Sequence, residues 1–318
     1  MLSSRYGLND EKRMTLEAIG EQYGITRERV RQIENHALSA IRRSDIFGRE
    51  ARTFDELAET VHELGGILSE EELLSLLART QELRNHIHIL LVLGDAFTKH
   101  KDDGDFYHRW HVHQPLAENV ETALRTLVEK LSEDDLIPDA EMVAKFRDLI
   151  RKDMPERYKN DEEILRRWLG LSKRIGRNPL GEWGIASSPN VRVKGMRDYA
   201  YLAIRRHGSP MHFTEVARAI SKLFGHKAHE ATCHNELIKD NRFVLVGRGL
   251  YALSEWGYAG GVVKDVIRAI LEKHGPLTRR EIIEKVLKER YVKENTVVVN
   301  LENAKHFKRN GEGKYLLV

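Results

Sequence analysis

The chain has 318 residues, more than one typical domain, so its length predicts two to five small units. Its 52 lysines and arginines nearly balance 49 aspartates and glutamates, so the formal net charge is only +3 and any strongly charged surface must be local. A single cysteine, Cys233, excludes an internal disulfide. We find no apolar run long enough for a signal peptide or a bilayer span, which predicts a cytoplasmic protein.

Residues 1–50 carry the pattern of two helices joined by a tight turn. Thr15 and Thr26 are suited to cap the two helices, and Gly24 is suited to the turn between them. The first helix is expected to place Leu16, Ile19 and Tyr23 on one side. On the second helix, spacings of three and four predict a buried stripe formed by Val30, Ile33, Ala37 and Ile41. The sequence therefore predicts a helix-turn-helix.

The opposite face of the second helix is rich in side chains that can contact DNA bases. It exposes Arg27, Glu28, Arg31, Gln32 and Asn35. In the major groove arginine fits guanine, glutamine fits adenine, and glutamate accepts from the cytosine amino group. Residues at the start of such a helix meet base edges first. The pattern favours a DNA-reading helix, and the alternative is a solvated face held by internal pairs between glutamate and arginine.

Residues 5–43, "RYGLNDEKRMTLEAIGEQYGITRERVRQIENHALSAIRR", resemble region 4 of primary-type bacterial sigma factors, which reads the upstream promoter hexamer. The most specific part is the run T-R-E-R-V-R-Q-I-E at residues 26–34. The resemblance implies base contacts by Arg27, Glu28 and Gln32. It implies contacts to the DNA backbone or flanking bases by Thr26, Arg29, Arg31, Asn35 and His36.

Three departures from the sigma family shape this expectation. His36 stands where the family usually has a lysine, which weakens one contact at neutral pH. The family's helix before the motif, which braces it and helps it dock on RNA polymerase, is reduced to "MLSSRYGL". We find no stretch similar to the regions that melt the promoter, so the resemblance implies promoter reading without promoter opening.

The rest of the chain contains an internal repeat. Residues 197–254 align with residues 263–317, and both predict a helix, a glycine turn, two further helices and a two-stranded wing. Looser copies precede them. The predicted fold is therefore mainly α with small β wings, in which the helix-turn-helix of residues 1–50 is followed by four winged-helix repeats at residues 51–114, 115–190, 191–258 and 259–318.

The third repeat resembles a second family. "AYLAIRRHGSPMHFTEVARAI" and "CHNELIKDNRFVLVGRGLYALSEWG", within residues 197–257, are similar to the HARE-type helix-turn-helix domain of the RNA polymerase delta subunit. The resemblance implies an accessory domain associated with transcription or with modified DNA. Apolar periodicity predicts a core of Leu202, Val216, Ile220, Leu237, Phe243, Val246, Tyr251 and Trp256.

Cations near the predicted wings are candidates for DNA contact. They are Arg242 and Arg248 in the third repeat and Lys308 and Arg309 in the fourth. A solvated charged surface is the alternative for each pair.

Two other patterns suggest sites but do not meet the requirements of one. His108, His111 and His113 do not share one strand face and have no nearby cysteine, and Asp102, Asp103 and Asp105 lack the full calcium-loop pattern. We find no catalytic motif, and Cys233 lies in a predicted helix as a small core residue would. We therefore expect no metal, no cofactor and no enzyme activity.

Three hypotheses about function remain. The first is a DNA-binding transcription protein that reads promoter-like double-stranded DNA with RNA polymerase and is associated with the nucleoid. The second is a scaffold that binds RNA polymerase through its winged helices. The third, a sensor of modified DNA linked to a restriction system, rests only on the similarity of the third repeat.

Overall fold

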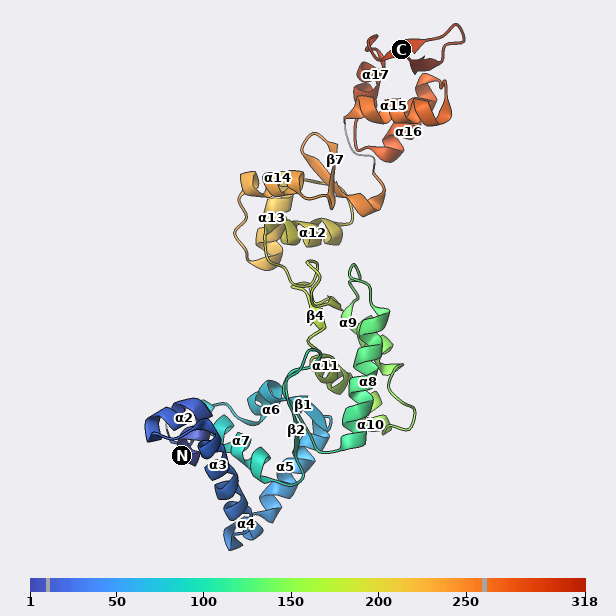
Figure 1. Cartoon of the computed structure of the whole chain (residues 1–318). Coiled ribbons are helices and arrows are strands. Elements are labelled where there is room, and N and C mark those ends of the chain that lie inside the picture. The colour runs from blue at the N-terminus through green and yellow to red at the C-terminus, as the bar shows by residue number, and fades with distance from the viewer. Residues whose placement is uncertain (10–11, 259–261) are drawn as a thin grey trace. The chain divides into compact units, whose positions relative to one another are not determined.

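The computed structural model describes residues 1–9, 12–258 and 262–318. The chain is mainly helical with small antiparallel sheets, which confirms the predicted fold class (Figure 1). It forms two compact units. The N-terminal unit comprises residues 1–177 and 181–191, and the C-terminal unit comprises residues 178–180 and 192–318.

The chain begins with a small helical head, residues 1–49. Its helices are α1 (Leu2–Tyr6), α2 (Leu16–Tyr23), α3 (Arg27–Arg42) and α4 (Asp45–Arg49). Tyr6 and Leu38 of the head form a small core with Leu93, which belongs to the first repeat. The head is therefore completed by residues that lie outside it.

The first repeat combines three helices with three short strands. Its elements are α5 (Ala51–Glu63), β1 (Ile67–Ser69), α6 (Glu70–Leu77), α7 (Gln81–Leu93), β2 (Thr98–His100) and β3 (Arg109–His111). The antiparallel sheet has the order β1-β3-β2, and Trp110 of the central strand lies opposite both Leu68 and Lys99. The hairpin formed by β2 and β3 holds Asp102, Asp103 and Asp105.

The second repeat follows the same order of elements. Its elements are α8 (Gln114–Lys130), α9 (Asp139–Arg147), α10 (Glu156–Lys159), α11 (Glu162–Leu169), β4 (Ile175–Arg177) and β5 (Trp183–Ile185). A bridge between Ile137 and Trp183 takes the place of the first strand. Ile67 and Phe106 of the first repeat lie in one apolar cluster with Phe146 and Trp168, so the first two repeats share a core.

The third repeat lies in the C-terminal unit. Its elements are α12 (Met196–His207), β6 (Met211–His212), α13 (Phe213–Phe224), α14 (Glu230–Lys239), β7 (Phe243–Gly247), β8 (Leu250–Leu253) and the 3-10 turn η1 (Ser254–Trp256). The strand order β6-β8-β7 matches that of the first repeat. Of the eight core residues predicted here, all are buried except Trp256, which is half-buried. Gly249 has a φ of +72° in the hairpin turn, a conformation that favours glycine.

The fourth repeat has the elements α15 (Val263–His274), α16 (Arg279–Glu289), α17 (Glu294–Leu301), β9 (Phe307–Arg309) and β10 (Tyr315–Leu317). A bridge between Leu277 and Tyr315 takes the place of the first strand. Its predicted start at residue 259 lies outside the described residues. The order helix, short strand or bridge, two helices and hairpin thus occurs four times along the chain, with a further short helix, α10, inserted in the second repeat.

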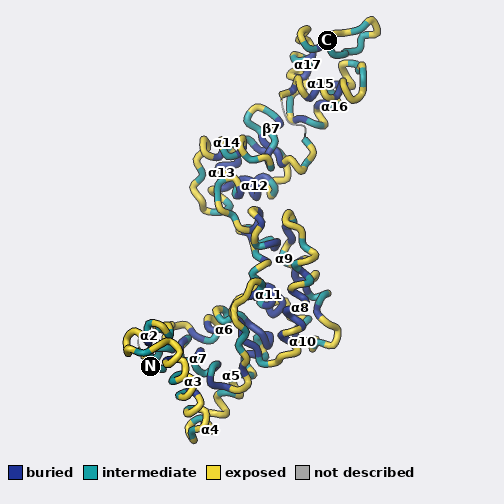
Figure 2. The backbone as a smooth tube through the Cα atoms, in the orientation of Figure 1, coloured by how far each residue is buried: buried dark blue, intermediate teal, exposed yellow. Residues whose placement is uncertain are grey.

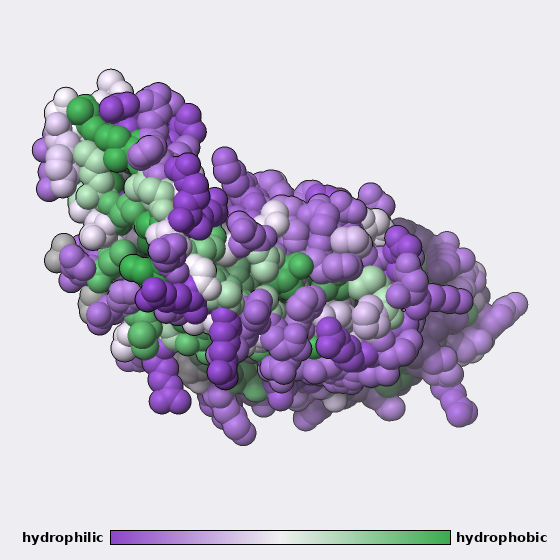
Figure 3. All heavy atoms as spheres, turned by 90° about the horizontal axis from the view of Figure 1, so that it is seen from below, coloured by the Kyte–Doolittle hydropathy of each residue, from purple (hydrophilic) through white to green (hydrophobic). Residues whose placement is uncertain are grey.

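The surface is mostly hydrophilic. Figure 3 shows one face, on which hydrophilic side chains predominate and an apolar strip runs along the left-hand lobe. Within the described residues, no helix is both long and apolar enough to span a membrane.

Candidate nucleic-acid interface

The helix-turn-helix of the head is defined by its caps. The Thr15 side chain accepts a hydrogen bond from the Ala18 amide at 3.1 Å, and the Thr26 side chain accepts one from the Arg29 amide at 3.2 Å. Gly24 ends α2 with a φ of 65°. A Cβ atom on Gly20 would lie 2.6 Å from the Ile25 carbonyl oxygen, so the close approach of α2 to the turn requires glycine there. The structure confirms the predicted caps at Thr15 and Thr26 and the predicted turn at Gly24.

One side of α3 is packed and the other faces solvent. Val30 and Leu38 are buried, and Ile33, Ala37 and Ile41 are half-buried. Leu38 is a core residue that the predicted stripe missed, and Tyr23 of α2 is exposed whereas Ile19, expected on the same side of that helix, is buried. The eight residues that the sequence assigned to DNA contact are all exposed, as Figure 2 shows for the yellow face of α3: Thr26, Arg27, Glu28, Arg29, Arg31, Gln32, Asn35 and His36.

The exposed side chains of α3 pair with one another. Arg31 donates two hydrogen bonds to the Glu28 carboxylate, at 2.7 and 2.8 Å, and these bonds lower the pKa of Glu28 and raise that of Arg31. Arg29 donates to the Gln32 side chain at 3.2 Å. Exposed pairs of this kind contribute little to stability, so base edges and phosphates can replace them at small cost. Charged and amide groups are therefore exposed together on one face of α3, where they can form new hydrogen bonds.

A longer ion pair links α3 to α2. Arg27 lies 3.6 Å from the Glu17 carboxylate, and both side chains are about two-thirds exposed. This contact leaves the Arg27 guanidinium at the first turn of α3, where a major-groove helix meets base edges first.

The opposite side of the head is held by α1, the segment that the sequence indicated as a reduced bracing helix, and by α7, which the sequence did not indicate as a support. On α1, Arg5 and Tyr6 donate hydrogen bonds to Glu34 of α3 at 3.1 and 3.0 Å. On α3, Arg42 donates to the Val92 and Leu93 carbonyl oxygens at the end of α7. These contacts leave the polar face of α3 uncovered.

Asn85 of α7 connects the head to the first repeat. It is fully buried, accepts a hydrogen bond from Arg13 at 2.7 Å and donates one to the Gly7 carbonyl oxygen at 2.9 Å. Nearby, the rings of Tyr6 and His88 lie 5.8 Å apart. Periodicity could not reveal this link, because Asn85 and Arg13 are 72 residues apart in the chain.

The four predicted wing cations lie in different surroundings. Arg242 is held in an ion-pair network, 2.8 Å from Asp198 and 2.7 Å from Asp240, whereas Arg248 is exposed at the hairpin turn. Lys308 and Arg309 are exposed on β9, although Arg309 also donates to the Gly313 carbonyl oxygen at 2.9 Å. Arg242 thus has a structural role, because it links the start of β7 to α12.

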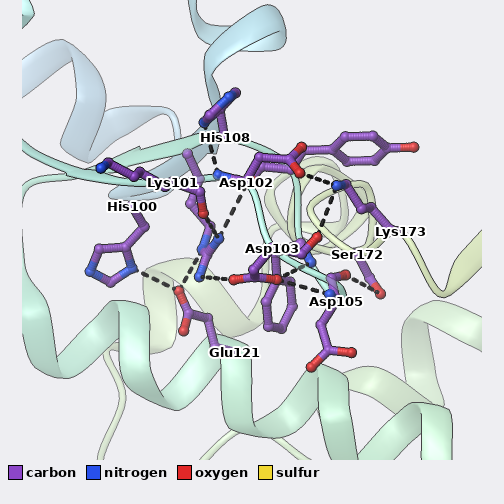
Figure 4. Close-up of polar contacts among 12 residues, drawn as sticks. His100, Lys101, Asp102, Asp103, Asp105, His108, Glu121, Ser172 and Lys173 are labelled. Atoms are coloured by element: carbon purple, nitrogen blue, oxygen red, sulfur yellow. Dashed lines mark hydrogen bonds and ion pairs between the residues drawn. The ribbon is translucent and has the colours of Figure 1, made fainter.

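The acidic hairpin of the first repeat is bound within the chain. Lys173 contacts Asp102, and its Nζ donates to the Asp103 carbonyl oxygen at 2.9 Å (Figure 4). Asp105 lies 3.3 Å from Arg125 and 3.6 Å from Arg174. The acidic residues therefore fasten the first repeat to the second.

The histidines of this region also make structural contacts. His108 accepts a hydrogen bond from the Asp102 amide at 2.8 Å, and His113 caps α8 by accepting one from the Leu116 amide at 3.3 Å. His111 lies 3.2 Å from His100, which in turn contacts Glu121. Across the described part of the chain, no cluster of histidine, cysteine and acidic residues has the geometry of a metal site.

Cys233 is fully buried in α14. Burial raises the pKa of its thiol to about 11, so the thiol stays protonated and unreactive at neutral pH. This environment is that of a core residue.

The head matches a known family. Residues 1–43 match the model of sigma-70, region 4. The match begins at residue 1 and so includes all of α1, whereas the segment on which the sequence resemblance was based, residues 5–43, contains only its last two residues.

Curated relatives match the same segment. The RNA polymerase principal sigma factor HrdD of Streptomyces griseus is 49% identical over 43 residues, and that of Streptomyces coelicolor is 44% identical over 43 residues. In both cases the match covers 14% of this chain and 13% of the relative. The similarity thus concerns the head, while the four repeats lie outside it.

Proposed function

We propose that this protein reads promoter-like double-stranded DNA through α3 and acts with RNA polymerase in transcription initiation or its regulation. The observation that carries the proposal is the uncovered polar face of α3, on a helix-turn-helix that matches sigma-70 region 4. In this proposal Arg27, Glu28 and Gln32 contact bases. Thr26, Arg29, Arg31, Asn35 and His36 contact the backbone or flanking bases.

The repeats have a supporting role in the same proposal. Their recurring element order supports four winged-helix units, of which the third is the HARE-type accessory domain that its sequence resembles. The first two repeats act as a scaffold for the head, because α7 and the acidic hairpin are engaged in contacts within the N-terminal unit. Association with the nucleoid follows from DNA binding.

Replacement of base-reading residues tests the proposal. Arg27→Ala or Gln32→Ala should weaken binding to a duplex that carries the upstream promoter hexamer by about 1–3 kcal/mol, or roughly five- to 150-fold. Binding to a scrambled duplex should change much less. The measurement is fluorescence anisotropy titration of the full chain at one fixed salt concentration, since affinities depend strongly on salt.

A matched control is Arg52→Ala on α5, which removes an exposed arginine paired with Glu56 at 2.8 Å. This change should leave both affinities nearly unaltered. Equal losses on hexamer and scrambled duplexes for the α3 variants would contradict the proposal.

The scaffold hypothesis predicts a different result for the same variants. If the repeats alone recruit RNA polymerase, the Arg27→Ala, Gln32→Ala double variant should capture RNA polymerase as well as the wild type does in the absence of DNA. Capture by the wild type with no preference for the hexamer duplex would favour the scaffold hypothesis over promoter reading.

A further inference from the structure

The last helix of each repeat, which directly precedes the hairpin, corresponds to α3 of the head, but in the first two repeats this helix is packed against other parts of the chain. In the first repeat, α7 holds the head through Asn85. In the second repeat, Trp168 of α11 is fully buried and donates a hydrogen bond to the Gly65 carbonyl oxygen at 3.1 Å. Arg167 of α11 also lies 3.6 Å from Glu72 of the first repeat. Neither helix is free to contact DNA.

In the fourth repeat, α17 has a free polar face. Val297 and Leu301 are buried against the core of the repeat, while Asn295, Thr296 and Val299 are exposed on the other side. Val299 is 60% exposed. Asparagine pairs with adenine, threonine contacts either base edge, and a methyl-bearing side chain packs on the thymine methyl group. The composition of this face fits the major groove.

Charge is distributed unevenly between the two parts of the chain. Residues 192–318 carry 24 lysines and arginines against 14 aspartates and glutamates, a net charge of +10. Residues 1–191 carry 28 against 35, a net charge of −7. The C-terminal unit is therefore the part of the chain with electrostatic complementarity to a phosphate backbone.

The exposed cations of the fourth repeat include residues on β9 and at the start of α16, while α17 itself carries none. Lys308 and Arg309 project from β9. Arg279 and Arg280 are exposed in the first turn of α16, where the helix dipole disfavours cations and so favours a nearby anion. The third repeat has fewer cations available for phosphate contact at its wing, because Arg242 is held by Asp198 and Asp240.

We propose that the fourth repeat is a second binding site for double-stranded DNA, in which Asn295, Thr296 and Val299 of α17 face the major groove and Lys308 and Arg309 contact phosphates. This proposal shares its ligand with the proposed function but stands on different residues. It implies that the full chain contacts DNA at two places, one at the hexamer and one in flanking duplex.

Hydroxyl-radical footprinting of the full chain tests the second site. The probe is a duplex with the hexamer and about two helical turns of flanking DNA on each side. The wild type should protect the hexamer and a separate block of flanking DNA. The quadruple variant Asn295→Ala, Thr296→Ala, Lys308→Ala, Arg309→Ala should lose the flanking block and keep the hexamer block. Loss of the two cations should reduce the slope of log K against log salt by about 2.

The matched control is Lys264→Ala, Lys273→Ala, which removes two exposed cations from α15. This variant loses the same amount of charge as the quadruple variant, but its two cations lie outside the proposed contact residues, so it should keep both protected blocks. Circular dichroism should show that both variants remain folded. A footprint that the quadruple variant leaves unchanged would overturn the second site. The second site would also be overturned if the quadruple variant weakened binding to single-stranded DNA but left binding to the duplex unchanged.

The Arg27→Ala, Gln32→Ala variant separates this proposal from the proposed function. If hexamer reading by α3 fails as a hypothesis, the wild type shows no preference for the hexamer, yet binding that depends on Lys308 and Arg309 persists. If the second site fails, the hexamer block is present and depends on α3, while no flanking block depends on the fourth repeat.

Discussion

At the scale of single residues, Asn85 determines how the head is held. Its buried amide satisfies Arg13 on one side and the Gly7 carbonyl oxygen on the other. Gly7 has a φ of +66°, and a Cβ atom there would lie 2.6 Å from the Asn85 amide nitrogen, so glycine is required for this approach. The sequence predicted that the polar residues of α3 would be exposed, but it could not predict the role of Asn85, because a buried asparagine has no periodic pattern.

We expect Asn85→Ala to destabilise the head by about 1–3 kcal/mol, because it leaves buried polar groups of Arg13 and Gly7 without their partner. Hydrogen exchange should show reduced protection in α1 and α2, while the C-terminal unit stays unchanged. Asn35→Ala, the same replacement on the exposed face of α3, is the control for stability and should have almost no effect. Unaltered protection in α1 would contradict the assigned role of Asn85.

At the scale of elements, local signals predicted the bounds of helices and hairpins but not their partners. Thr15, Gly24 and Thr26 act as caps and turn as expected, because these roles depend on adjacent residues. The docking of α11 on the Gly65 turn joins positions 103 residues apart, and no local pattern encodes it. The same holds for the acidic hairpin, whose carboxylates bind Lys173 and Arg125 of the second repeat.

Glu70, the first residue of α6, joins that helix to the sheet and to α7. It accepts a hydrogen bond from the Trp110 indole at 2.8 Å and contacts Lys99 and His88. Burial alone would raise the pKa of Glu70, but the hydrogen bonds from His88 and Lys99 outweigh it and hold the pKa well below its usual value. The folded state therefore gains stability from Glu70 above its ordinary pKa of 4.5 and loses it as the pH falls further.

We expect the wild type to lose at least about 1 kcal/mol more stability than Glu70→Gln between pH 6 and pH 3, because one unit of pKa shift corresponds to about 1.4 kcal/mol. At pH 7 the variant should be the less stable of the two. Urea unfolding of the N-terminal unit at several pH values measures both effects. Parallel pH profiles for the two proteins would show that Glu70 does not contribute in this way.

At the scale of the whole molecule, the chain forms two compact units of opposite net charge. The near-neutral total of the sequence concealed this asymmetry, which becomes visible once the division near residue 191 is known. The repeats were predicted as a series, and the first two share a core because Ile67 and Phe106 pack with residues of the second repeat. Such shared cores depend on contacts between repeats, which an alignment of repeats does not show.

The division between the units predicts where a protease acts first. Arg192 and Lys194 are exposed in a segment without regular structure that precedes α12. Limited digestion with trypsin should therefore cut there first and yield two stable fragments, identified by mass spectrometry. An Arg192→Ala, Lys194→Ala variant should resist this first cut. Initial cleavage at Lys101, in the acidic hairpin, would contradict the rigid fastening of that hairpin.

Helices α7 and α11 pack on parts of the chain that precede them in sequence, and this order has a consequence for synthesis on the ribosome. The head begins at residue 1 but is completed by Asn85 and Leu93, and the Gly65 turn of the first repeat is completed by Trp168. During translation, the head and the Gly65 turn therefore cannot complete their packing until the later segments that contact them have been synthesised. Helix α3 acquires its final support only after α7 has left the exit tunnel, so the nascent head cannot complete its packing while the first repeat is still being made.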